Sequence, residues 1–168
     1  MAFSSDMVHD TFGHRLRVRV CGLCFSGEDL LLVRHRGIGE KGYLYAPPGG
    51  GMDYGEGAEE ALVREMEEET GLRVAVRNFL FVYEYRELPL HALELFFAVD
   101  LLDGKLKVGQ DPEMAAEDQL IEGVAFMSPE AIARERGSQM HDMINRCQVP
   151  KQLLSWRGYF EFENKTRN

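Results

Sequence analysis

The sequence predicts an α+β fold in a single domain. Stretches with the alternating or continuous apolar pattern of β-strands recur along the chain, and stretches with helical periodicity lie at separate positions between them. The 168 residues are enough for one full hydrophobic core. We therefore expect one domain over residues 1–168, with a loose leader at 1–12 and a frayed tail at 163–168.

The first half of the chain is expected to fold as a β-hairpin followed by a helix. Its predicted elements are, in order, a strand at 14–25, a turn at 26–29, a more buried strand at 30–36, a glycine-rich loop at 36–42 and a helix at 57–70. Gly57 is an acceptable N-cap for this helix, and Gly71 is a natural stop after its last turn. Arg15, Arg17 and Arg19 alternate with apolar residues, so we expect them on the solvated face of the first strand.

The second half is expected to be rich in strands. Its predicted elements are, in order, two strands at 72–87 and 91–102 joined by a turn at 88–90, an acidic loop at 107–119, a strand at 120–127, a short helix from Ser128 to about Gly137, a further helix within 138–154 and a β-like segment at 156–163. Ser128 and Pro129 are the residue types that favour the N-cap and the first position of a helix.

Composition and charge limit the classes of protein to which the chain could belong. The 45% hydrophobic content is ordinary for a globular protein, no apolar run is long enough to cross a membrane, and the start MAFSSDMVHD lacks the features of a signal peptide. The net charge of −9 argues against a nucleic-acid-binding surface, which would be basic. We therefore expect a cytoplasmic protein with no nucleic-acid and no membrane partner. A nucleotide substrate is still allowed, because a metal ion can supply local positive charge.

The three cysteines, Cys21, Cys24 and Cys147, are expected to be reduced, and Cys21 and Cys24 are expected to be structural. An odd number without a secretion signal is typical of reduced thiols in the cytoplasm. Cys21 and Cys24 have the spacing of zinc and redox pairs, but no second CxxC or histidine pair completes a zinc site. They also lie three apart on a predicted strand, which places their side chains on opposite faces.

Residues 50–72 carry the strongest functional signal, because the predicted helix presents Glu65, Glu68 and Glu69 on one face. At roughly 100° per residue, these carboxylates share an arc of about 100°. Neighbouring carboxylates repel one another, and the C-terminal end of a helix disfavours negative charge. No lysine occurs in residues 43–103 to offset them. A solvated acidic face is the alternative, but we predict a site for a hard cation such as Mg²⁺, Mn²⁺ or Ca²⁺.

The spacing in this stretch resembles that of the Nudix hydrolase family. The family pattern, called the Nudix box, is G, five residues, E, seven residues, then R-E-apolar-x-E-E-x-G-apolar. This chain fills its fixed places with Gly50, Glu56, Arg64, Glu65, Glu68, Glu69 and Gly71, and its apolar places with Met66 and Leu72. Seven fixed places match by chance in on the order of 10⁻⁸ windows. The preceding YLYAPPGG is similar to the family's lead-in W-x-x-P-G-G, with Tyr43 or Tyr45 near its aromatic place.

The resemblance implies the Nudix fold, a mixed β-sheet sandwiched between α-helices. It also implies a hydrolase that cleaves the pyrophosphate bond of a nucleoside diphosphate linked to another moiety, with Mg²⁺ as cofactor and Mn²⁺ as a substitute. The implied metal ligands are Glu65, Glu68, Glu69 and the backbone carbonyl near Gly49. Glu68 and Glu69 would be the principal ligands, and Glu65 would be a third ligand or the base. Arg64 would hold one carboxylate of the box, Glu56 or Glu68, in place.

A general base could also come from outside the box, because several Nudix subfamilies use a glutamate on a later loop. The candidates here are Glu113, Glu117 and Glu122, of which we prefer Glu117, and the alternative for each is a solvated loop acid. Arg34 and Arg36 follow a buried strand toward the box, so they could bind phosphate or lie on the surface.

The substrate beyond this class is indicated by weaker features. ADP-ribose pyrophosphatases often carry a proline near the position of Pro89, so we favour ADP-ribose or a nucleotide sugar. The alternatives are a nucleoside triphosphate, or a Nudix domain that binds a nucleotide without cleaving it. The alternating aromatic residues of 79–85 are typical of sheet packing, and one of them or Tyr45 could stack on a base. Many family members are dimers, so a homodimer is one assembly that the resemblance allows.

Overall fold

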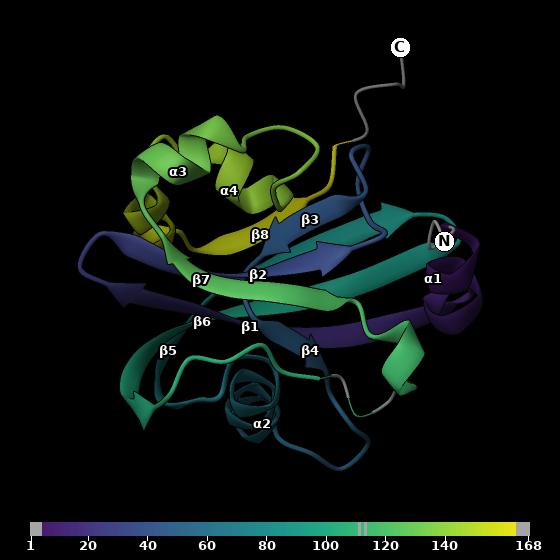
Figure 1. The fold of residues 1–168 in the computed structure, drawn as a ribbon, viewed down its shortest axis with the longest axis horizontal. Helices are drawn as coiled ribbons and strands as arrows, with labels where there is room; N and C mark the ends of the chain where they lie inside the picture. The colour runs from purple at the N-terminus through teal and green to yellow at the C-terminus, as the bar shows by residue number, and fades with distance from the viewer. Residues whose placement is uncertain (1–4, 111, 113, 164–168) are drawn as a thin grey trace.

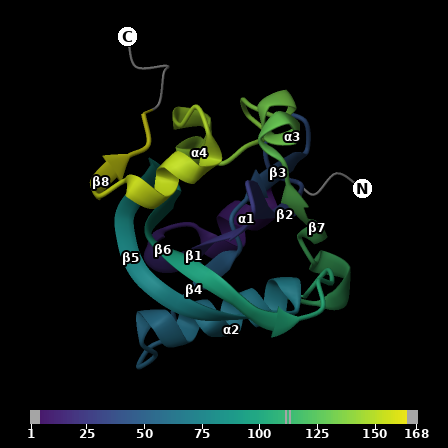
Figure 2. The same ribbon diagram turned by 90° about the vertical axis from the view of Figure 1, so that its left-hand side faces the viewer.

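The computed structural model describes residues 5–110, 112 and 114–163, and its centre is one strongly curved, mixed β-sheet. The elements are α1 (Ser5–Phe12), β1 (Arg15–Ser26), β2 (Asp29–Arg36), β3 (Tyr43–Ala46), β4 (Gly49–Gly51), α2 (Ala58–Thr70), β5 (Leu72–Glu87), β6 (Leu90–Gly104), η1 (Ala116–Asp118), β7 (Ile121–Met127), α3 (Pro129–Arg134), α4 (Asp142–Arg146), η2 (Pro150–Ser155) and β8 (Gly158–Glu161). α2 lies on one side of the sheet, and α3 and α4 lie on the other (Figure 1, Figure 2). The predicted α+β fold, with a mixed sheet between helices, is confirmed.

The strands follow the order β3-β2-β1-β6-β5-β8, with β4 beside β1 and β7 beside β2. β1 and β2 form the predicted hairpin, in which Phe25 pairs with Leu30. β5 and β6 form the second predicted hairpin and are antiparallel along their length. β1 runs parallel to β6, from Arg15 opposite Leu90 onward, and this pairing joins the two hairpins into one sheet.

Two hydrophobic clusters pack on opposite faces of the sheet. The cluster beneath α3, α4 and η2 includes Cys21, Leu23, Phe81, Phe96, Ile132, Met143 and Leu153. The cluster beneath α2 includes Val20, Cys24, Leu31, Leu62, Met66 and Val74. Cys21 and Cys24 thus point to opposite faces, as predicted, and all three cysteines are buried and free. The predicted packing role of the aromatic residues on β5 holds for Phe81 and Tyr83, which are almost fully buried.

α2 has the ends that the sequence predicts. Gly57 occupies the N-cap, and Gly71 at the C-cap has φ +73°, a left-handed conformation that glycine adopts without strain. The helix packs closely on β1, because a Cβ atom at Gly22 would lie 2.9 Å from the Met66 sulfur. Leu62 and Met66 are fully buried in this contact, so the apolar stripe of α2 fixes the adjoining face, which carries the carboxylates, beside β4.

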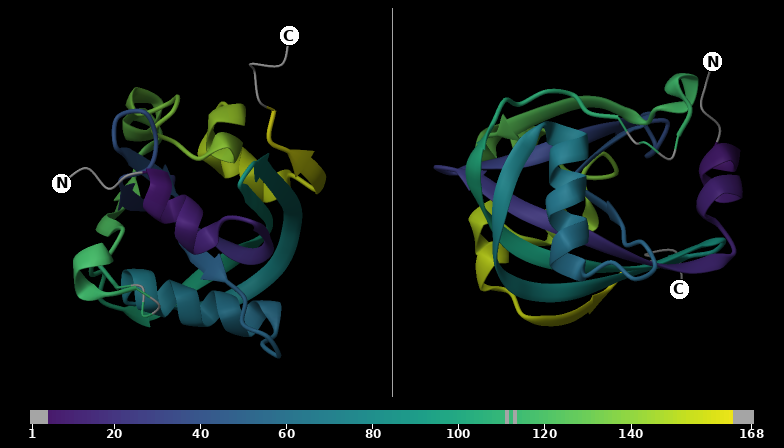
Figure 3. Two further views of the ribbon diagram at one scale, coloured as in Figure 1. Left: turned by 90° about the vertical axis from the view of Figure 1, so that its right-hand side faces the viewer. Right: turned by 90° about the horizontal axis from the view of Figure 1, so that it is seen from below.

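The N-terminal segment differs from the prediction. Residues 5–12, expected to be part of a loose leader, form α1. Val8 and Phe12 lie one turn apart on α1, and both line a cavity of the protein, so the helix gains an apolar surface to pack on. Figure 3 shows α1 lying across one open end of the curved sheet. The segment 43–55, predicted only to lead into the helix, contains the two short strands β3 and β4.

The segment 138–154, predicted to contain a helix, forms only the short α4 and the 3₁₀ helix η2. Val149 precedes Pro150 and is extended, because a residue before proline avoids the helical conformation. The predicted short helix after Ser128 is confirmed as α3, and the Ser128 hydroxyl caps it by accepting the Ala131 N–H. Most of the predicted tail, 164–168, lies outside the described residues. Within the described part of the chain, no helix is long and apolar enough to span a membrane.

Candidate active site

The glycine strand β4 lies directly against the acidic face of α2. β4 is antiparallel to β1, with Gly49, Gly50 and Gly51 opposite Cys21, Val20 and Arg19. A Cβ atom at Gly50 would lie 2.3–2.5 Å from the carboxylate atoms of Glu65, and a Cβ atom at Gly49 would lie 1.9 Å from the Val20 carbonyl oxygen. Only glycine allows this approach, so these glycines of the lead-in bring the strand and the helix together.

Arg64 holds three glutamates through one guanidinium group. Its Nε and Nη2 donate to the two carboxylate oxygens of Glu56 at 2.7 and 2.9 Å. Its Nη1 donates to Glu65 at 2.9 Å and to Glu68 at 3.2 Å. The predicted partner was Glu56 or Glu68, and the structure shows both. Contact with Arg64 lowers the pKa of Glu56 to about 2, so that carboxylate is charged at neutral pH.

Glu65 and Glu69 are more buried than Glu68. Glu69 is 7% exposed, and one of its carboxylate oxygens accepts the Gly49 N–H at 2.9 Å. Burial raises the pKa of Glu65, although its contact with Arg64 opposes the shift. The three carboxylates expected on one face of α2 therefore border the same space, two held by Arg64 and one by the backbone of β4.

These carboxylates line a cavity of about 190 Å³ between α2, the sheet and α1. Its lining includes Val8, Phe12, Arg17, Arg19, His35, Gly49, Gly50, Gly51, Arg64, Glu65, Glu68, Glu69, Glu94, Leu120, Ile121 and His141. The cavity thus has an acidic wall on α2 and a wall with arginine and histidine side chains on the sheet. Such a combination suits an anionic substrate that is bound together with metal ions.

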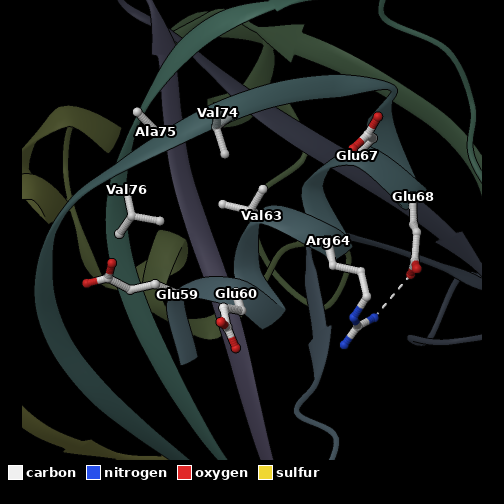
Figure 4. Close-up of a pocket in the computed structure, with 9 residues that line it drawn as sticks. All are labelled: Glu59, Glu60, Val63, Arg64, Glu67, Glu68, Val74, Ala75 and Val76. Atoms are coloured by element: carbon white, nitrogen blue, oxygen red, sulfur yellow. Dashed lines mark hydrogen bonds and ion pairs between the residues drawn. The ribbon is translucent and has the colours of Figure 1, made fainter. Parts of the chain in front are cut away.

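A second, shallow groove of about 680 Å³ lies between the outer side of α2 and β5 (Figure 4). Its floor is formed by Val63, Val74 and Val76, and its rim includes Glu59 and Glu67. In Figure 4 the side chain of Glu67 points away from Arg64. The groove is larger than the cavity, but its lining lacks Glu65 and Glu69, so we assign the predicted chemistry to the cavity.

The carboxylates of α2 suit a hard divalent cation in chemistry, since carboxylate oxygens are its preferred ligands. Among the residues that the structure describes, no three histidine, cysteine, aspartate or glutamate side chains converge closely enough to hold a metal ion. Instead, Arg64 donates hydrogen bonds to Glu65 and Glu68, and the Gly49 N–H donates to one oxygen of Glu69. The metal site and the ligand role of the Gly49 carbonyl therefore stay predictions.

The two arginines predicted outside the box, Arg34 and Arg36, do not line the cavity. Arg34 forms an ion pair with Glu122 at 2.6 Å and stacks on the Tyr43 ring, and Arg36 Nε donates to the Gln119 carbonyl at 2.7 Å. Neither arginine lines the cavity, because strand alternation directs the intervening His35 there. The structure thus favours the surface alternative over phosphate binding, and Glu122 is occupied as a partner of Arg34.

The preferred base, Glu117, lies in η1, and its side chain is outside the described part of the chain, as is the whole of Glu113. Neighbouring residues Leu120 and Ile121 line the cavity, so this segment does border it. The role of Glu117 stays a prediction. Pro89 lies at the β5–β6 turn and is absent from the cavity lining.

A group of residues that the sequence did not single out forms the wall opposite α2. Glu94 on β6 accepts from His141 Nε2 at 2.7 Å and is 3.3 Å from Arg19 Nε. Burial opposes ionisation of Glu94, but His141 and Arg19 outweigh it and hold its pKa at about 2. The expectation that Arg17 and Arg19 lie on a solvated face is wrong, because both line the cavity. The available signal was Glu94 itself, a charged residue within the apolar run LELFFAV.

Comparisons with known proteins agree with this geometry. The family model described as the NUDIX domain matches residues 13–147. An ADP-ribose pyrophosphatase of Methanocaldococcus jannaschii is 38% identical over 100 residues, which are 58% of this chain and 59% of that protein. The chain thus matches about three fifths of the length of this curated relative.

Solved structures share the fold at low sequence identity. A NUDIX hydrolase from Nitrosomonas europaea has a TM-score of 0.69 and 18% identity, and the match covers 85% of this chain and 93% of that one. An ADP-ribose pyrophosphatase from Streptococcus suis has a TM-score of 0.57 and 17% identity, with 86% and 98% covered. At such identities the likeness supports the architecture alone.

Proposed function

The chain belongs to the NUDIX domain family, whose model matches residues 13–147, and from this premise we propose that it is a metal-dependent pyrophosphohydrolase. It would cleave the pyrophosphate bond of a nucleoside diphosphate linked to another moiety. The observation that carries the proposal is the position of Arg64, which is paired with Glu56 and holds Glu65 and Glu68 at a cavity wall next to the glycine strand. A degenerate, non-catalytic domain would have no need for this complete set.

The residues of the cavity would have different roles in the hydrolysis of a phosphoric anhydride. Glu65, Glu68 and Glu69 would hold Mg²⁺, or Mn²⁺ in its place, and the bound ion would neutralise phosphate oxygens and activate water. Arg64 fixes the carboxylates that border it, and the Gly49 N–H fixes Glu69. The buried Glu65, whose pKa is raised, suits the role of a third ligand or of a base. Glu117 is the alternative base.

We propose ADP-ribose as the first substrate to test. The support is the 38% identity to a curated ADP-ribose pyrophosphatase, over about three fifths of that protein. The sequence feature that favoured ADP-ribose or a nucleotide sugar, Pro89, does not line the cavity and adds no geometric support. A nucleoside triphosphate is the second candidate, because the site chemistry of the pyrophosphate bond would be the same. We place the protein in the cytoplasm, in line with its free cysteines.

A panel of ADP-ribose, nucleotide sugars and nucleoside triphosphates, assayed with Mg²⁺ and with EDTA, tests the proposal. We expect Mg²⁺-dependent release of AMP and ribose 5-phosphate from ADP-ribose. A nucleoside triphosphate would give a nucleoside monophosphate and pyrophosphate instead. A higher kcat/KM for triphosphates would refute ADP-ribose as the preferred substrate and would still agree with the proposed hydrolase activity. Binding without cleavage anywhere in the panel would support the non-catalytic alternative.

A further inference from the structure

The wall of the cavity opposite α2 contains a chain of three polar side chains to which the reaction outlined above gives no role. It runs from His141 at the N-cap of α4, through Glu94 on β6, to Arg19 on β1. The side chains of Arg19, Glu94 and His141 are only 25%, 12% and 11% exposed. Removing charged groups from water to this extent is unfavourable. We therefore expect the cluster to compensate for this cost, either by stabilising the fold or by binding a ligand.

The orientation of His141 is fixed from both sides of its ring. Its Nδ1 accepts the Met143 N–H at 3.2 Å, so the proton of the neutral ring lies on Nε2 and is donated to Glu94. The rings of Tyr83 and Phe96 pack edge-on against the imidazole, at centroid distances of 5.2 and 5.6 Å. One oxygen of Glu94 is thereby engaged, and the other faces Arg19.

Strand pairing in the sheet places Arg19 next to the glycine strand β4. Arg19 pairs across β1–β4 with Gly51 and across β1–β6 with Glu94, so the three residues occupy one rung of the sheet. Gly51 adds no side chain to this rung, and a Cβ atom there would meet only Arg17 Nη2, at 3.8 Å. Glu94 is the only described residue within ion-pair distance of Arg19, and it is reached from Nε. Within the described part of the chain, Nη1 and Nη2 donate no hydrogen bond to the protein, so the outer edge of the guanidinium group can serve a ligand.

We propose that Arg19 binds the diphosphate of the substrate through this outer edge, and that Glu94 and His141 are positioning residues that hold it there. A guanidinium group presents parallel N–H donors that match two phosphate oxygens, which an ammonium group cannot do. The anionic group would then lie between Arg19 on the sheet and the carboxylates with their cations on α2. The inference rests on the proposed function, since it assigns a subsite within the same cavity.

A purely structural role for the cluster is the competing explanation. In that case the ion pair between Arg19 and Glu94 would serve only to join β1 to β6. Its loss would then lower the melting temperature and leave ligand affinity unchanged in the folded variant. A phosphate-binding role predicts that ligand affinity falls while the melting temperature changes little. The melting temperature should change little because strand pairing over ten registered positions already joins β1 to β6.

The test uses Arg19→Gln, Arg19→Lys, Glu94→Gln and the double variant Arg19→Gln/Glu94→Gln. Arg15→Gln is the matched control, because Arg15 lies on the same strand, is exposed and does not line the cavity. Affinity is measured by calorimetry with the non-hydrolysable α,β-methylene-ADP in saturating Mg²⁺, and with adenosine, which lacks phosphate. KM and kcat are measured with the panel substrate that the wild type cleaves best.

We expect Arg19→Gln to weaken α,β-methylene-ADP binding and raise KM by at least about tenfold, as for loss of a charge-assisted hydrogen bond. Adenosine binding and the Arg15→Gln control should not change. Arg19→Lys should recover part of the affinity, because it keeps the charge without the planar fork. Glu94→Gln should raise KM less, and the double variant should be no worse than Arg19→Gln, because Glu94 acts through Arg19.

Unchanged diphosphate affinity in folded Arg19→Gln would overturn the inference, and additive effects in the double variant would overturn the positioning role of Glu94. If Arg19→Gln does not fold, Arg19→Lys decides, since wild-type affinity in that variant would exclude recognition by the guanidinium fork. The two levels of proposal fail separately. A wild type that cleaves nothing in the panel refutes the hydrolase, whereas binding of α,β-methylene-ADP still tests Arg19.

Discussion

Glu69 is the residue on which the metal proposal can be tested with least disturbance of the structure. One of its oxygens accepts the Gly49 N–H, and glutamine can keep this bond through its amide oxygen. We expect Glu69→Gln to fold normally and to lower kcat by at least about two orders of magnitude, because a lost ligand acts mainly on transition-state charge. Steady-state kinetics in Mg²⁺, with circular dichroism as the check on folding, measure this. Near-normal turnover in the folded variant would refute the assignment.

The contact between Glu56 and Arg64 predicts a specific pH dependence of stability. The pKa of Glu56 is lowered from about 4.5 to about 2 in the folded protein. A lowered pKa contributes stability that is fully present above the ordinary value and is lost as the pH falls through the lowered one. Glu56→Gln removes this contribution. We therefore expect the difference in unfolding free energy between wild type and variant to be constant above about pH 5.5 and to shrink between about pH 4.5 and 2.

Urea unfolding from pH 2.5 to 7 measures this difference. Glu94, whose pKa is also about 2, titrates in the same window, but it is present in both proteins and cancels from the difference. A difference that stays constant down to the lowest pH would show that the Glu56 carboxylate gains nothing from Arg64.

At the scale of single residues, the sequence predicted the box well and the opposite wall poorly. The spacing of Glu65, Glu68 and Glu69 fixes their common face from local helix geometry alone. Periodicity also placed Arg17 and Arg19 on one face of a strand, correctly. Whether that face meets water or a cavity depends on α1, β4 and α2, which come from elsewhere in the chain, and no local pattern contains this information.

At the scale of elements, the contact of β4 with α2 gives a matched pair of glycine variants. A Cβ atom at Gly50 would lie 2.3–2.5 Å from the Glu65 carboxylate, whereas one at Gly51 would meet only Arg17 Nη2, at 3.8 Å. The Glu65 carboxylate is the flexible end of a side chain, so we expect Gly50→Ala to displace it and leave the protein folded. We expect kcat to fall at least about tenfold in Gly50→Ala and much less in Gly51→Ala. Equal kinetics of the two variants would contradict a role for the close approach.

The elements that the sequence predicted are those whose signals are local. α2 has its glycine caps and apolar stripe, and the two hairpins have their alternation and turns. The elements it missed, α1, β3 and β4, are stabilised by distant partners instead. β4 consists of three glycines with no strand propensity, and it is a strand because β1 lies beside it. α1 is short, and it depends on the cavity edge that Val8 and Phe12 cover.

At the scale of the whole molecule, the fold places an acidic helix and a cationic strand on opposite sides of one cavity. The net charge of −9 is thus not spread evenly around the cavity, because Arg17 and Arg19 face the carboxylates of α2. Arg64 already offsets part of the repulsion between Glu65 and Glu68. A divalent cation would offset more, so the stability of the folded protein should depend on the metal.

We expect Mg²⁺ to raise the melting temperature at constant ionic strength. An ion that binds only the native state at ten times its Kd adds about 1.4 kcal/mol, which is roughly 3–5 °C for a domain of this size. Glu68→Gln should reduce this rise, because it removes one ligand charge. Without metal, its melting temperature should change little, since the variant loses a 3.2 Å contact with Arg64 and also a repulsion with Glu65. Differential scanning calorimetry with Mg²⁺ or EDTA, with salt added to match ionic strength, measures both effects. An equal Mg²⁺ shift in wild type and variant would place the metal elsewhere, and the carboxylates of α2 would then need another function.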